Sequence, residues 1–181
     1  MTPEAIITAI LALFPHMSGH NRACIIQRQE QIVQQLYEAS QPVSPGAPVP
    51  PVELTAAVAF AETHLGCDHN EGGGWGAPVS RVRRHVAGTH VHAVRVLSRG
   101  YDVCGDWDHS VMRFRTGLCR PQTSPSLHVR FVGVRYLHTI HSIIARMRRH
   151  HQRNNIAYHS TQTWGGSDVF MGSGVHTAGS P

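Results

Sequence analysis

Apolar residues recur every three or four positions in most segments of this chain, and no segment alternates apolar and polar residues convincingly. Spacing of three and four places side chains on one face of an α-helix, whereas strict alternation is typical of a strand. The first predicted helix is capped by Thr2 and has Pro3 at its first position. Its apolar face consists of Ile6, Ile7, Ile10, Leu11 and Phe14. The pattern predicts an all-α protein.

Further helices are predicted over residues 21–39, 52–65, 80–98 and 107–114, and another begins near Ser124. That last helix is expected to turn inward Leu127, Phe131, Val134, Leu137, Ile140, Ile144 and Met147. Between the second and third helices, five of the eleven residues from Gln41 to Pro51 are prolines, which predicts a semi-rigid linker. We therefore expect an N-terminal helical pair (1–40), the linker (41–51), one helical domain (52–150) and a flexible polar, Gly- and Ser-rich tail (151–181).

The length and the apolar runs limit the class of protein. A chain of 181 residues, 41% of them hydrophobic, can bury a core without a disulfide or metal scaffold. The longest apolar run, from Ala5 to Phe14, is too short to cross a bilayer, so we expect no membrane span. No basic segment precedes that run, and we therefore expect no classical signal peptide.

The charge of the chain is basic and comes entirely from arginine. Sixteen Arg stand against eleven acidic residues, Lys is absent, and the net charge is +5. Arg81, Arg83 and Arg84 form one cluster, and residues 146–153 contain another. Such a balance favours anionic partners, and both nucleic acid and anionic cell-wall polymers qualify. No nucleic-acid-binding module is evident, so we do not predict specific DNA recognition.

Glu62 is the first candidate for chemistry. Leu54, Val58, Ala61 and Leu65 form a narrow stripe on the predicted third helix, and Glu62 lies roughly 40° beyond Val58 at its edge. Partial shielding from water generally favours the protonated form of a carboxyl, which is the form a general acid needs. The alternative is a solvated residue at the boundary of the helix face.

Two segments after Glu62 add to this interpretation. The glycine-rich stretch from Glu71 to Gly76 lets a polymer approach the backbone, and Trp75 offers a face on which a sugar ring can stack. A flexible surface connection is the alternative for this loop. Farther along, Cys104 and Cys119 flank a capped helix and a turn, and their separation permits a disulfide.

Taken in order, these segments resemble the lysozyme-like lytic transglycosylases, the family related to goose-type lysozyme. Residues 59–63 (AFAET) stand where the family has its catalytic Glu, usually followed by Ser, at a helix end. Residues 74–77 (GWGA) stand where it has a Gly-Leu-Met-Gln loop, and residues 113–117 (RFRTG) where it has Ala-Tyr-Asn-x-Gly. The flanking cysteines are similar to those of a cysteine-bearing subset. The resemblance covers about residues 52–147 and depends on the order and spacing of three motifs.

The resemblance implies a lysozyme-like helical domain that cleaves peptidoglycan between N-acetylmuramic acid and N-acetylglucosamine. Glu62 would act first as acid and then as base, and no cofactor or metal is expected. The implied substrate-binding residues are Thr63, Gly74, Trp75, Gly76, Phe114, Arg115 and Gly117. Phe114 and Arg115 replace the Tyr and Asn of the family, which leaves an inactive or retargeted site open. Asp68 and Glu71 leave plain hydrolysis open as well.

Other functions stay as alternatives. His64, Cys67, Asp68 and His69 are zinc-type ligands, but their spacing does not match a compact Cys/His site. The chain could also be an inactive lysozyme-like adaptor that binds the cell wall, or a basic nucleic-acid-binding protein. The expected partner is the peptidoglycan glycan strand, with the N-terminal helices as a protein-docking element. An active enzyme would reach the wall by a phage particle or by non-classical export, so we assign no location.

Overall fold

The computed structural model describes residues 1–42, 44–67 and 89–164, with side chains in the last range described for 96–156. The described residues form seven α-helices and a short 3-10 helix, without a strand, so the all-α prediction is confirmed. The helices are α1 (Pro3–Leu13), α2 (Gly19–Gln27), α3 (Gln29–Ala39), α4 (Val52–Thr63), α5 (Thr89–Cys104), α6 (Trp107–Thr116), η1 (Pro121–Thr123) and α7 (Leu127–Trp164).

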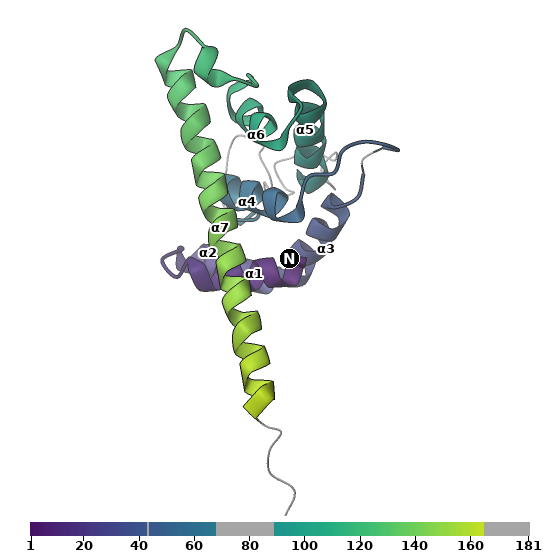
Figure 1. Cartoon of the computed structure of the whole chain (residues 1–181), viewed down its shortest axis with the longest axis vertical. Helices are drawn as coiled ribbons and strands as arrows, with labels where there is room; N and C mark the ends of the chain where they lie inside the picture. Colours follow the sequence, from purple (N-terminus) through teal and green to yellow (C-terminus); the bar gives the residue numbers. More distant parts are fainter. Residues whose placement is uncertain (43, 68–88, 165–181) are drawn as a thin grey trace, which may run out of the picture.

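Helix α4 lies at the centre of the molecule. Figure 1 shows α1, α2 and α3 on one side of it, α5 and α6 on the other, and α7 running along both groups. Every residue of α4 from Leu54 to Phe60 is buried. The same hydrophobic core contains Ile6 of α1, Leu36 of α3 and Ile140 of α7, so the N-terminal helices and the predicted domain share one core.

The N-terminal segment contains three helices instead of the predicted pair. The expected second helix breaks at Arg28, which separates α2 from α3. Ile26 and Tyr37, on the two resulting helices, are 52% and 44% exposed. The break has a tertiary reason, because the Arg28 guanidinium donates to the carbonyl of Gly66 at 3.0 Å, just beyond α4.

Helix α7 differs from its prediction in extent and in orientation. It continues past the expected boundary at residue 150 to Trp164. Its first three predicted inward residues, Leu127, Phe131 and Val134, are 76%, 62% and 46% exposed, so that part of the predicted face is wrong. The contact with η1 explains the rotation, because a Cβ at Gly133 would come within 2.5 Å of Pro121. Gly133 therefore has to face η1, which turns the three apolar residues outward.

Two other predictions concern the helices and their surroundings. The expected start of the fourth helix at Ser80 lies outside the described residues, and α5 ends at Cys104 instead of Ser98. The described helices include none that combines the length and the apolar character required to cross a bilayer.

Candidate functional site

Glu62 is the second-last residue of α4, and only 11% of its side chain is exposed. The neighbouring Thr63 is fully buried: its hydroxyl donates to the carbonyl of Ala59 at 3.2 Å and accepts from the N–H of Gly66 at 3.0 Å. These contacts close the end of the helix. The hydroxyl that the sequence assigns to substrate binding is thus bonded within the protein.

The chain turns sharply immediately after Thr63. His64 and Leu65 both have positive φ angles, 46° and 59°, a conformation that residues other than glycine rarely adopt. Long-range contacts hold this turn, because Cys67 forms a disulfide with Cys24 of α2. This pair was not singled out from the sequence. The backbone behind Glu62 is fixed by elements more than forty positions away in the sequence.

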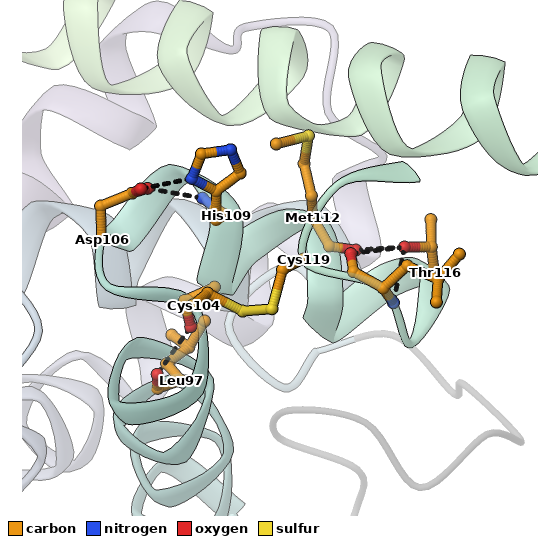
Figure 2. Close-up of a disulfide and its surroundings, with 9 residues drawn as sticks. Leu97, Cys104, Asp106, His109, Met112, Thr116 and Cys119 are labelled. Atoms are coloured by element: carbon orange, nitrogen blue, oxygen red, sulfur yellow. Dashed lines mark hydrogen bonds and ion pairs between the residues drawn. A yellow bond between two sulfur atoms is a disulfide. The ribbon is translucent and has the colours of Figure 1, made fainter. Parts of the chain in front are cut away.

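Helix α6 carries the second part of the site, and local residues set its ends. The Asp106 carboxylate accepts from the backbone N–H of His109 at 2.8 Å and also pairs with the His109 ring (Figure 2). At the other end, Gly117 caps the helix with a φ of 76°, which favours glycine. Gly117, a predicted substrate-binding residue, therefore has a structural reason to be glycine.

Close packing on α5 fixes the position of α6. The Ser110 hydroxyl donates to the carbonyl of Leu97 at 2.6 Å, and Gly100 leaves room for Ser110, since a Cβ there would lie 2.3 Å from the Ser110 oxygen. A disulfide joins Cys104, the last residue of α5, to Cys119, the pair that the sequence singles out (Figure 2). These contacts determine where the C-terminal turn of α6 points.

Glu62, Arg115 and Tyr136 meet where α4, α6 and α7 come together. Arg115 Nη1 lies 3.5 Å from Glu62 Oε2, and the Arg115 guanidinium lies 5.6 Å from the centre of the Tyr136 ring. The Phe114 ring stacks on Tyr136 with centroids 6.4 Å apart. Of the two residues predicted from the sequence, Arg115 therefore lies beside the Glu62 carboxyl, and Phe114 packs on Tyr136.

Tyr136 was not predicted. Among the described residues its buried hydroxyl has no hydrogen-bond partner within bonding geometry, and the Glu62 carboxylate acts on it electrostatically. Burial, and secondly the Glu62 carboxylate, raise the pKa of Tyr136. The phenol therefore stays protonated over the physiological range and can donate its O–H to a carboxylate. Tyr136 comes from α7. The sequence signal was present, because Tyr136 lies three residues after Gly133 and four before Ile140 on the buried face.

Gly74, Trp75 and Gly76, together with Asp68 and Glu71, are outside the described residues. Within the described part of the chain, no three His, Cys, Asp or Glu side chains converge as metal ligands.

Comparison with known proteins found no family model, no curated protein and no solved structure that matches this chain.

Proposed function

We propose that this protein cleaves the glycan strand of peptidoglycan between N-acetylmuramic acid and N-acetylglucosamine, with Glu62 as the single acid and base. The observation that carries the proposal is the environment of that carboxyl. It lies on the last turn of a buried helix, is nearly shielded from water, and lies close enough to the buried phenol of Tyr136 to raise the pKa of that phenol. A fixed and shielded carboxyl with a neutral hydrogen-bond donor beside it is suited to proton transfer.

In the proposed reaction, Glu62 donates its proton to the glycosidic oxygen as the bond from that oxygen to C1 of N-acetylmuramic acid breaks. The C6 hydroxyl of the same sugar then attacks C1, and its proton passes to Glu62. The product is a 1,6-anhydro ring, and the carboxyl returns to its initial state. This chemistry needs one carboxyl, in contrast to the paired carboxyls of most glycosidases.

Arg115 and Tyr136 have different expected roles. The Arg115 side chain is 48% exposed and its contact with Glu62 is long, so an entering sugar can displace it at little cost. Tyr136 is half-buried and held by Phe114, so it stays beside the carboxyl and orients it. We therefore assign Arg115 to substrate contact and Tyr136 to positioning.

The disulfides support an extracytoplasmic site of action. All four cysteines are paired, as Cys24–Cys67 and Cys104–Cys119. Disulfides persist in oxidising compartments and are rare in the reducing cytosol. An oxidising compartment is also where a protein meets the cell wall.

The test is digestion of purified peptidoglycan, with the products resolved by mass spectrometry. We compare the wild type with Glu62→Gln, and use Glu30→Gln, which changes an exposed glutamate on α3, as the matched control. Anhydro-muropeptides from the wild type and the control, but not from Glu62→Gln, are the expected result.

Two other results would overturn the proposal. Reducing ends without anhydro sugars would replace transglycosylation by hydrolysis. The absence of any product from the folded wild type would refute the enzyme. If that protein still binds the wall, the contact between Arg115 and Glu62 would then favour a non-catalytic wall-binding protein.

A further inference from the structure

An open groove of about 480 Å³ lies between the end of α1, the end of α4 and the middle of α7. On α4 its lining includes Ala61, the residue before Glu62. On α7 it includes Arg135 and Thr139, which bracket Tyr136 along the helix. The lining therefore includes the sequence neighbours of Glu62 and Tyr136 but neither of these two residues.

The groove combines an apolar surface with positive charge. The rings of Phe14 and Phe60 in its lining are 4.6 Å apart. Its ionisable lining residues are Arg135, Arg146, His64 and His138, and the described lining contains no acidic residue. A concave surface that carries charge of one sign concentrates its potential and attracts ligands of the opposite sign.

Helix α7 explains this excess of positive charge. Over Leu127–Trp164 its sequence has no Asp or Glu. The same helix carries six arginines and six histidines: Arg130, Arg135, Arg146, Arg148, Arg149, Arg153, His128, His138, His141, His150, His151 and His159. Three of the four ionisable residues in the groove belong to α7. No acidic residue on that helix offsets their charge.

Arg146 is held in place before any ligand arrives. Its guanidinium lies 4.4 Å from the centre of the Phe14 ring, and Nη2 donates to the carbonyl of Leu13 at 2.6 Å. A guanidinium has five N–H donors, so further donors remain for a ligand. Because the side chain is already ordered, binding costs little additional side-chain freedom. Arg135, also in the lining, is exposed; it lies eleven residues before Arg146, about 16 Å along the helix, and its guanidinium lies 5.7 Å from the centre of the Phe131 ring.

We propose that this groove binds a carboxylate carried by the glycan substrate, so that the enzyme selects acidic strands over neutral ones. The inference rests on the proposed function for the identity of the glycan. An arginine guanidinium matches a carboxylate, and the rings of Phe14 and Phe60 match the apolar part of an organic substituent. The carboxylate comes either from the lactyl group of N-acetylmuramic acid or from an attached peptide.

The test measures binding to the Glu62→Gln protein, which does not consume the ligand. Isothermal titration compares four fragments of equal glycan length: a peptide-free fragment with free lactyl carboxylates, a fragment with peptide stems, and the amidated form of each. We expect amidation to weaken binding about tenfold, the usual effect of losing a charged hydrogen bond. The affinity of the acidic fragments is also expected to fall as NaCl is raised.

Variants then locate the effect. Arg135→Gln should remove most of the preference for acidic fragments, and Arg135→Glu should remove all of it. Arg99→Gln deletes an exposed arginine on α5, outside the groove, and should leave the preference unchanged. The fragment that loses affinity on amidation identifies the source of the carboxylate.

Equal affinity for acidic and amidated fragments would overturn the inference, as would an equal loss in Arg99→Gln and Arg135→Gln. Absence of binding to either acidic fragment would overturn it as well. The cleavage assay is a separate measurement. If the wild type cleaves peptidoglycan but acidic and amidated fragments bind equally, only the proposed role of the groove is refuted. If acidic fragments bind more tightly but nothing is cleaved, only the proposed enzymatic activity is refuted.

Discussion

The two helix ends that carry the candidate site are built in different ways. The end of α4, with Glu62, turns through two non-glycine residues of positive φ and is held by contacts with α2 and with Arg28. The end of α6, with Arg115, turns at a glycine and is held by a disulfide to the adjacent helix α5. One end depends on the whole fold, and the other depends on its own neighbourhood.

The difference indicates where the fold holds strain. A non-glycine residue with positive φ costs of order 1–3 kcal/mol and persists only where its surroundings enforce it. Leu65 is fully buried, and the carbonyl of Gly66 accepts from Arg28, so the N-terminal helices enforce the turn after Glu62. Such strain is concentrated at functional sites, which agrees with the proposed role of Glu62. The N-terminal helices thus contribute to the site without supplying a site residue.

The largest expected effect comes from removing the long-range disulfide. The Cys24→Ser, Cys67→Ser double variant should lose about 4 kcal/mol of unfolding free energy, and Cys104→Ser, Cys119→Ser about 3 kcal/mol, because the closed loops differ in length. The sequence separations are 43 and 15 residues. Urea denaturation of the oxidised proteins measures both values. A greater loss from the local disulfide would contradict the view that the α4 end depends more on its cross-link.

An intermediate effect is expected from Tyr136→Phe, which deletes the phenol and keeps the ring that stacks on Phe114. If Tyr136 orients Glu62, kcat should fall about 100-fold while KM changes little. The matched control is Tyr37→Phe, which deletes an exposed phenol that donates to Glu4 at 3.3 Å. Steady-state assays on soluble glycan fragments measure both constants. If Tyr136→Phe lowers the unfolding free energy but leaves kcat unchanged, Tyr136 contributes to packing and does not orient Glu62.

The same contrast explains what could be predicted from the sequence. The features of the α6 end are local: Asp106 caps the helix, Gly117 ends it and two cysteines flank it. The capped helix, the turn and the flanking cysteines were predicted from neighbouring residues. For the α4 end, periodicity placed Glu62 at the edge of the buried face. The pairing of Cys24 with Cys67 and the contact of Arg28 with Gly66 depend on how distant helices pack, which periodicity does not contain.

The orientation of α7 was mispredicted for a similar reason. Apolar side chains at helical spacing indicate that a helix has an apolar face, but Phe131 and Val134 show that an apolar residue need not be buried. The small residue Gly133 decided the rotation through its contact with Pro121. That rotation also brought Tyr136 to Glu62, so the error about the helix face and the omission of Tyr136 have one cause. The role of the loop over residues 71–76 stays a prediction.

The smallest expected effect tests the local character of the α6 end. Partial burial raises the pKa of Asp106, but the hydrogen bonds from the backbone and ring of His109 outweigh it and lower the pKa below the usual 3.8. Asp106→Ala should cost about 1 kcal/mol of unfolding free energy at pH 7, the typical value of an N-cap. Asp102→Ala, at an exposed carboxyl on α5, is the control.

The pH dependence of that difference follows from the direction of the shift. A carboxyl whose pKa is lowered in the folded state stabilises the fold above its unfolded pKa, and the stabilisation is lost as pH falls through the folded pKa. The difference between wild type and Asp106→Ala should therefore be constant above about pH 5 and should shrink below about pH 4. A difference that stays unchanged to pH 2 would show that the charge of Asp106 does not matter. Because only α6 depends on this cap, acid should loosen Arg115 while the α4 turn that holds Glu62 remains cross-linked to α2.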